Sequence, residues 1–334
     1  MNQDHRYKDL ENWLSNAIDK PIKNIIPAST DASFRSYFRV FIDNQNTYIA
    51  VDAPPEYEDS VKFVKIASLM QAMDIRVPKI IATNLQEGFL LISDLGEETM
   101  LKETEFYAEH RQETKVQKLY EGAIDILFKM QTNGSSHVEG LPLYSKELLM
   151  DEMRLFVDWF CLRHLHIGPE IIDDYNFEEI FEQLSVYALS QHQVFVHRDF
   201  HSRNILLSEK GDMGVVDFQD AVMGPITYDL VSLLKDCYIS LPSSKIDHWV
   251  DYYFARLMDH ELIDKSHQEF KLEFDLMGVQ RHLKAIGIFS RLKYRDGKDS
   301  YVLDIPRTIN YVYTTAKKHP FLDPLYQFIH QYVY

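Results

Sequence analysis

The stretch VFVHRDFHSRNILL, residues 194–207, decides the fold class and contains the most informative polar residues of the chain. Its two ends, Val194 to Val196 and Ile205 to Leu207, are short and apolar, which predicts two buried strands. The loop between them carries Asp199 and, five positions later, Asn204. Because strand ends are rigid supports, a polar loop in this place is a candidate active site.

A second motif, MGVVDF at residues 213–218, places Asp217 at the end of a further short strand. Phosphoryl transfer needs a carboxylate to deprotonate a hydroxyl, hard oxygen ligands for Mg²⁺ and a rigid frame for both. The two motifs together predict Asp199 as a catalytic base and Asn204 and Asp217 as magnesium ligands. The alternative is a β-hairpin with a polar turn, in which Asp199 and Asn204 only cap loops.

Composition limits the classes of partner and the expected location. The chain has 334 residues and a formal net charge of -16, which argues against a nucleic-acid partner. Two cysteines are too few for a disulfide framework and fit a reducing compartment. The polar start of the chain predicts no secretory signal, and its apolar runs are too short for a membrane span. A cytoplasmic enzyme without a membrane partner is expected.

The pattern along the chain predicts an α+β fold with two lobes. Residues 1–95 form a β-rich N-terminal lobe with strands expected at 22–27, 34–42, 47–51, 79–82 and 88–92, and helices at 7–18 and 61–73. Residues 96–334 form a mostly helical C-terminal lobe, with helices expected at 103–131, 146–164 and 177–191 and again beyond Pro242. A short hinge near residues 93–97 would place a ligand cleft between the lobes.

Two further residues are expected to support the loop. Asp229 opens an apolar helix in GPITYDLVSLL, where an aspartate serves as an N-cap or reaches back to brace the loop. His197 is expected to fix the loop by packing and hydrogen bonding. Asp229 is not predicted to be a metal ligand, and His197 is not predicted to act as an acid or a base.

These residues resemble the protein kinase-like superfamily, and specifically the aminoglycoside phosphotransferase family, over nearly the whole chain. The resemblance implies a bilobal kinase-like fold, ATP and Mg²⁺ as cofactors, and an adenine contact from the backbone of Ser93, Asp94 and Leu95. Only eleven residues separate Asp217 from Asp229, too few for the activation segment of protein kinases. The acceptor is therefore expected to be a small molecule and not a protein.

Two longer stretches look like a narrower group within this family. They are VVDFQDAVMGPITYDLVSLLKDCY at residues 215–238 and QRHLKAIGIFSRLKYRDGK at residues 280–298. Both are similar to the anomeric sugar kinases that phosphorylate N-acetylmuramate and N-acetylglucosamine in peptidoglycan recycling. The resemblance implies an amino-sugar α-1-phosphate as product.

The nucleotide half of the site departs from the kinase pattern. Ser29, Thr30 and Ser33 stand where a glycine-rich loop is usual, so either phosphate contact or a plain hairpin turn is expected there. The strand at 47–51 carries no lysine to hold the α- and β-phosphates. Three cations are alternatives for that charge: Arg35, Lys62 and Lys65.

Arg281 and His282, near Lys284, are candidates for the acceptor pocket, at what is expected to be a helix start. The alternative is an ordinary solvated basic face of a helix. Two other functions stay open. The acidic chain suits a cationic acceptor of the aminoglycoside, choline or ketosamine type, and the missing lysine suits a non-catalytic pseudokinase that acts as a binding module.

Overall fold

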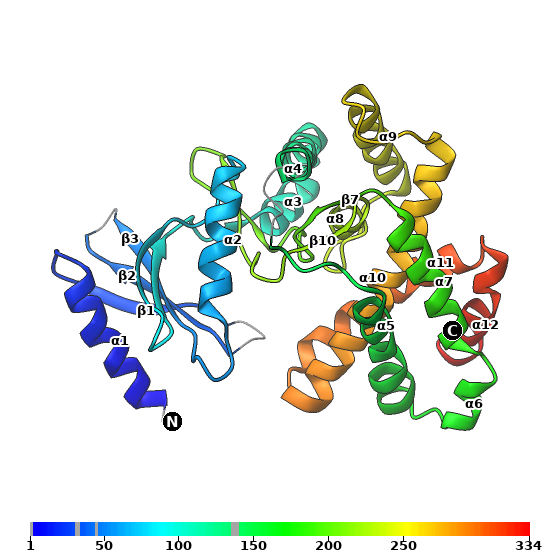
Figure 1. Cartoon of the computed structure of the whole chain (residues 1–334), viewed down its shortest axis with the longest axis horizontal. Helices are drawn as coiled ribbons and strands as arrows, with labels where there is room; N and C mark the ends of the chain where they lie inside the picture. Colours follow the sequence, from blue (N-terminus) through cyan, green and yellow to red (C-terminus); the bar gives the residue numbers. More distant parts are fainter. Residues whose placement is uncertain (1–2, 31–33, 44–45, 135–139) are drawn as a thin grey trace. The chain divides into compact units, whose positions relative to one another are not determined.

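The computed structural model describes residues 3–30, 34–43, 46–134 and 140–334 (Figure 1). The chain folds into two compact units. Unit 1 contains Met1–Glu98 and Leu206–Gln219, and unit 2 contains Thr99–Ile205 and Asp220–Tyr334. The predicted lobe boundary between residues 95 and 96 lies close to Glu98, where the chain first passes from unit 1 to unit 2. The later segment Leu206–Gln219, which was predicted to lie in the C-terminal lobe, belongs to unit 1.

Unit 1 is built on an antiparallel sheet in the order β1-β2-β3-β5-β4. Leu10 and Leu14 of helix α1 pack on one face of the sheet, where alternate strand residues are apolar. Helix α2 lies on the opposite face (Figure 1). The bounds are α1 Gln3–Ala17, β1 Asn24–Thr30, β2 Ser36–Phe41, β3 Thr47–Asp52, α2 Ser60–Ala72, β4 Ile80–Asn84 and β5 Phe89–Ser93.

A short three-stranded sheet, in the order β6-β8-β9, contains β6 (Glu98–Thr99), β8 (Ile205–Leu207) and β9 (Met213–Val215). Within unit 1, the backbone N–H of Val215 donates to the carbonyl of Arg76 at 2.8 Å, and Arg76 Nη1 donates to the carbonyl of Asp212 at 2.8 Å. These bonds hold both ends of β9, and so fix the strand that leads to Asp217.

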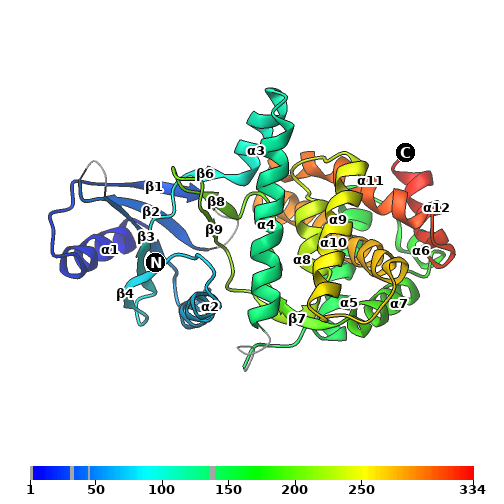
Figure 2. The same ribbon diagram turned by 90° about the horizontal axis from the view of Figure 1, so that it is seen from above.

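Unit 2 is mostly helical, and α10 runs among α5, α7, α8 and α11 (Figure 2). Gly287 permits a close approach, because a Cβ atom there would lie 2.4 Å from the carbonyl carbon of Leu155. The bounds are α3 Met100–Glu109, α4 Glu113–Gly134, α5 Lys146–Leu155, the π-helix η1 Phe156–His164, α6 Pro169–Asp173, α7 Phe177–Ser190, α8 Tyr228–Leu234, α9 Ser243–Asp259, α10 His267–Asp296, η2 Asp299–Asp304, α11 Ile305–Ala316, η3 Pro320–Leu322 and α12 Asp323–Tyr332.

Two predicted helices differ from the observed ones. The helix expected at 103–131 is broken between α3 and α4, where Arg111 adopts a left-handed backbone with φ 55° that ends α3. The helix expected at 146–164 changes from α5 to a π-helix at Phe156. The α+β class, with a β-rich N-terminal region and a mostly helical remainder, is confirmed.

Unit 2 also holds a two-stranded sheet of β7 (Gln193–Val196) and β10 (Val222–Pro225). The strands are antiparallel, and Val196 pairs with Val222. Strand β10 was not predicted, because its glycine and proline weaken the strand pattern. Among the described residues, no helix has the length and apolar content needed to cross a bilayer.

Candidate active site

The loop that follows β7 is held by Asp229. The backbone N–H groups of His197 and Arg198 donate to Asp229 Oδ2 and Oδ1 at 2.7 and 3.0 Å. Asp229 is the second residue of α8, whose N-cap is Thr227, so the expectation of an N-cap is wrong. The carboxylate instead satisfies two backbone donors of the loop that precedes Asp199.

Arg198 has a left-handed backbone, with φ 77°. This conformation costs a non-glycine residue roughly 1–2 kcal/mol, so it needs support from its surroundings. The support comes from Asp229 on the backbone and from Glu152, which forms an ion pair with the Arg198 guanidinium. Asp199, the next residue, takes its direction from this fixed turn.

The second half of the loop is closed by local hydrogen bonds. Asn204 Nδ2 donates to the carbonyl of Asp199 at 3.0 Å, and the N–H of Asn204 donates to the carbonyl of His201 at 2.9 Å. The N–H and hydroxyl of Ser202 donate to the buried carboxylate of Asp236 at 3.0 and 2.6 Å. Sequence reasoning missed Asp236, which anchors the loop as Asp229 does.

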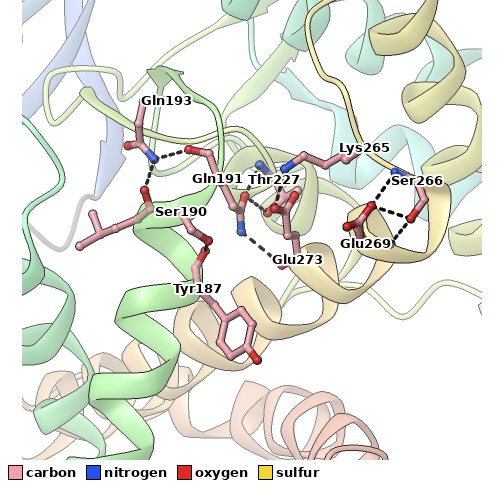
Figure 3. A network of polar contacts seen from close by, with 10 residues as sticks. Tyr187, Ser190, Gln191, Gln193, Thr227, Lys265, Ser266, Glu269 and Glu273 are labelled. Atoms are coloured by element: carbon pink, nitrogen blue, oxygen red, sulfur yellow. Dashed lines mark hydrogen bonds and ion pairs between the residues drawn. The ribbon is translucent and has the colours of Figure 1, made fainter.

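The start of α8 is fixed by a polar network shown in Figure 3. Gln191 Oε1 accepts hydrogen bonds from Thr227 Oγ1 at 2.7 Å and from Thr227 N at 3.3 Å. Gln191 Nε2 donates to the carbonyl of Glu273 in α10 at 3.4 Å, and the Glu273 carboxylate pairs with Lys265. The network joins the end of α7 and the first turns of α10 to the residue that caps α8, and so limits movement of Asp229.

A pocket in unit 2 opens beside Asp199. Its charged lining consists of one carboxylate, from Asp199, and three cations, from Arg198, Arg281 and Lys284. Burial lowers the pKa of His201, which also lines the pocket, so its ring is neutral near pH 7. The other lining residues are Tyr228, Cys237, Tyr238, Ala285, Ile288 and Phe289. A small molecule in this pocket would place a hydroxyl next to Asp199.

Glu152 of α5 joins two of these cations. Its carboxylate is 2.9 Å from Lys284 Nζ, pairs with Arg198, and accepts hydrogen bonds from Tyr144 and Gln280. Sequence reasoning missed Glu152. A signal was present, since Glu152 falls at helical spacing between the buried residues Leu149 and Phe156, and a carboxylate on a buried helix face needs a cation.

The charges of this group act on Asp199, which is half-buried. Desolvation raises the pKa of Asp199, but the charges of Lys284 and Arg198 lower it, and the net result is a pKa below the usual value. The carboxylate is therefore ionised at neutral pH, the state that accepts a proton from a hydroxyl.

The predicted acceptor residues lie in the middle of α10 and are buried, so both the expected helix start and the solvated-face alternative are wrong. Arg281 lines the pocket, as does Lys284. His282 does not line it. Its Nε2 donates to the carbonyl of Lys235 at 2.8 Å, and its ring stacks on Tyr311. Burial and the charge of Arg281 lower the pKa of His282 to about 3. The ring of His282 is thus engaged with Lys235 and Tyr311, and its predicted contact with the acceptor stays a prediction.

In unit 1, Asp217 follows β9 with a left-handed backbone, φ 65°, and its Oδ1 accepts a hydrogen bond from Gln219 at 2.8 Å. Arg35 is buried and pairs with Glu58 at 2.8 Å. Burial lowers the pKa of Arg35, but Tyr37, Glu58 and Asp217 raise it above its ordinary value. Of the three cations considered for the missing lysine, Lys65 is exposed and Arg35 is within electrostatic reach of Asp217.

The hinge residues are partly engaged within unit 1. The N–H of Ser93 donates to the carbonyl of Lys79 at 2.9 Å. The Asp94 carboxylate accepts hydrogen bonds from Arg39 at 2.6 Å, Thr47 at 2.9 Å and the N–H of Gly96 at 2.9 Å. The N–H of Ser93 is therefore engaged in the sheet, and the adenine contact expected from the backbone of residues 93–95 stays a prediction.

The serine-rich segment before β2 is described only in part. Ser29 and Thr30 belong to β1, opposite Tyr37 and Ser36 of β2. Ser33, the third residue predicted to contact phosphate, lies outside the described residues. The strand pairing agrees with a hairpin, which is compatible with either predicted role.

Comparison with known proteins gives the same family as the motifs. Residues 24–261 match the phosphotransferase enzyme family. The N-acetylmuramate/N-acetylglucosamine kinase of Pseudomonas aeruginosa is 38% identical, over 97% of this chain and 96% of that protein. The protein of the same name from Pseudomonas putida is 35% identical, over 98% of this chain and 96% of that protein.

Solved structures show the same fold at low identity. The ADP-bound aminoglycoside phosphotransferase APH(2'')-Ib is 14% identical, covers 93% of this chain and 98% of its own, and gives a TM-score of 0.57. The choline kinase LicA from Streptococcus pneumoniae is 12% identical, with 93% and 99% of the two chains covered and a TM-score of 0.62. These likenesses confirm the predicted kinase-like fold.

The match over most of the chain and the whole-length relatives confirm the predicted family resemblance. This chain therefore belongs to the phosphotransferase enzyme family and is an enzyme that transfers a phosphoryl group to a hydroxyl group of a small molecule.

Proposed function

We propose that this enzyme uses ATP and Mg²⁺ to phosphorylate the anomeric hydroxyl of N-acetylmuramate or N-acetylglucosamine, in peptidoglycan recycling. The observation that carries the proposal is the identity of 38% over 97% of the chain with a protein of that name. The pocket beside Asp199 supports it, because its charged groups suit a neutral or anionic sugar.

Asp199 is the catalytic base of the proposed reaction. It takes the proton of the acceptor hydroxyl as the oxygen attacks the γ-phosphorus of ATP, and ADP leaves. An anomeric hydroxyl is more acidic than an ordinary alcohol, so a single carboxylate suffices. Asp229 and Asp236 hold the loop in one conformation, and this alignment is a large part of the catalytic effect.

Asn204 and Asp217 are the proposed magnesium ligands, and their chemistry fits the ion. Asn204 uses its amide nitrogen on the Asp199 carbonyl, so the amide oxygen is the atom for a cation. Amide and carboxylate oxygens are the hard ligands that Mg²⁺ prefers. When bound, the ion neutralises charge on the transferred phosphoryl group.

Arg35 is proposed to replace the phosphate-binding lysine that β3 lacks. Its ion pair with Glu58, just before α2, holds a cation near Asp217 in unit 1. In protein kinases a lysine–glutamate ion pair and the metal-binding aspartate must both be in place for catalysis. The backbone of Asp94 and Leu95 is proposed to meet adenine, and the backbone N–H groups of Ser29 and Thr30 to approach the phosphates.

The pocket distinguishes the proposed acceptor from the alternatives. An aminoglycoside, choline or a ketosamine carries positive charge, which Arg281 and Lys284 would repel. The acidic net charge of the whole chain therefore does not predict the charge of this pocket. A pseudokinase is disfavoured because Asp199 is both braced and kept ionised.

The test is ADP release with MgATP and a panel of acceptors: N-acetylmuramate, N-acetylglucosamine, glucosamine, an aminoglycoside and choline. We expect turnover with the two N-acetylated sugars and loss of that turnover in Asp199→Asn. Turnover only with a cationic acceptor would overturn the substrate assignment. ADP release that does not respond to Asp199→Asn would overturn the catalytic one.

A further inference from the structure

Arg281 differs from the other two cations of the pocket in its partners. Arg198 and Lys284 both form ion pairs with Glu152. Within the described part of the chain, Arg281 forms no ion pair. Its Nη1 donates to Cys237 Sγ at 3.6 Å, and its Nε is buried without a hydrogen-bond partner.

This state is unusual for a buried guanidinium. Arg281 is 6% exposed, and a buried charged donor is normally satisfied by a carboxylate or several acceptors. A thiol is a weak acceptor and does not replace them. Because Arg281 also lines the pocket beside Asp199, a ligand there is positioned to supply the missing acceptors.

The acids near Arg281 are engaged elsewhere. Asp229 accepts the backbone N–H groups of His197 and Arg198, and Asp236 accepts those of Ser202 and Tyr238. Their charges favour the ionised guanidinium at a distance, as does that of Asp199. The charge of Arg281 is thus tolerated in the fold while its hydrogen-bonding capacity is left for a ligand.

We propose that Arg281 binds the lactyl carboxylate of N-acetylmuramate. The proposal rests on the proposed function and deepens it, since N-acetylglucosamine has no such group and would leave the subsite empty. A guanidinium offers paired N–H groups that match a carboxylate. Ala285, Ile288 and Phe289, on later turns of α10, line the same pocket and give the lactyl methyl group an apolar wall.

The experiment compares three acceptors that differ at one group: N-acetylmuramate, its lactyl methyl ester and N-acetylglucosamine. With the wild-type enzyme, we expect the ester to lower kcat/KM by roughly 10- to 100-fold relative to the acid. In Arg281→Met the acid should fall to the level of the ester. N-acetylglucosamine should change by less than about threefold. Arg291→Met is the matched control, because Arg291 lies on the same helix and is absent from the pocket lining.

Each outcome decides the assignment. An ester as good as the acid in the wild type, or an equal loss for all three acceptors in Arg281→Met, would overturn it. If Arg281→Met does not fold, Arg281→Lys is the second variant. It keeps the positive charge but lacks the paired N–H groups of a guanidinium, so the preference for the acid over its ester should shrink. If no amino sugar is phosphorylated at all, the proposed function fails. Calorimetric binding of the acid and the ester then tests the subsite alone, and equal affinities would overturn it.

Discussion

Lys284 Nζ lies 2.9 Å from Glu152 Oε1, in a buried pair that also takes in Arg198. One carboxylate thus balances two cations, and the second negative charge of the group is that of Asp199. The arrangement links α5 and α10 to the loop after β7. The packing of these elements therefore sets which charges lie near Asp199, the proposed base.

Removing the Glu152 charge should destabilise unit 2. Glu152→Gln leaves the buried Lys284 and the half-buried Arg198 without their carboxylate, and breaking a buried pair of this kind costs about 3–5 kcal/mol. The free energy of unfolding, measured by urea denaturation, should fall by that amount. Glu178→Gln is the control, since its pair with Arg154 is exposed and should change the value by less than about 1 kcal/mol. Equal changes in the free energy of unfolding would show that the buried pair stabilises the fold no more than the exposed pair does.

Replacing the proposed base should affect turnover and spare nucleotide binding. Asp199→Asn keeps the shape of the side chain but cannot accept the proton. General-base catalysis accounts for roughly 10²- to 10⁴-fold, so kcat should fall by that factor. The affinity for MgATP, measured by calorimetry, should stay within about threefold of the wild type. A kcat within tenfold of the wild type would remove Asp199 from the role of base.

The proposed role of Arg35 predicts a defect in nucleotide use. Arg35→Met removes the cation paired with Glu58, and the KM for ATP should rise by about tenfold or more, the effect of one charged hydrogen bond. Lys65→Met on the exposed side of α2 should leave this KM unchanged. If Lys65→Met raises the KM and Arg35→Met does not, the assignment of the two cations must be exchanged.

Asp229 should make stability depend on pH. Burial raises its pKa from 3.8 to about 7, although the N–H groups of His197 and Arg198 act in the opposite direction. The folded chain therefore holds this proton more tightly than the unfolded chain does. The stabilisation that the folded chain gains from binding this proton is present in full below about pH 4 and is lost as the pH rises towards 7.

The measurement for Asp229 is urea denaturation of the wild type and Asp229→Asn from pH 4 to pH 8. The variant cannot titrate at this position, so other ionisable groups cancel in the difference between the two. We expect the wild type to lose stability relative to the variant as the pH approaches 7. A difference that stays constant over this range would contradict the raised pKa.

Much of the fold could be read from the sequence because local composition and helical spacing are informative. The strands of unit 1 are rich in branched and aromatic residues, and α2 repeats its buried residues at helical spacing. The break at Arg111 and the strand β10 could not be read. The first depends on one left-handed residue, and the second on a partner 26 residues earlier in the chain, since Val222 pairs with Val196.

The candidate site was predictable only where residues share a motif. Asp199 and Asn204 stand five positions apart, so their contact is local. Glu152 and Lys284 are 132 positions apart, and only tertiary packing shows that they meet. Arg281 and His282 are neighbours in the sequence, but Arg281 lines the pocket while the ring of His282 bonds to the carbonyl of Lys235. On a helix, adjacent residues point in different directions.

The most direct test of the account is the position of the transferred phosphate. The enzyme is incubated with MgATP and N-acetylmuramate, and the product is examined by ³¹P and ¹H NMR. We predict a phosphate coupled to the C1 proton of the sugar, formed by the wild type and at least about 100-fold more slowly by Asp199→Asn. A phosphate coupled to the C6 protons, or no sugar phosphate at all, would contradict the account.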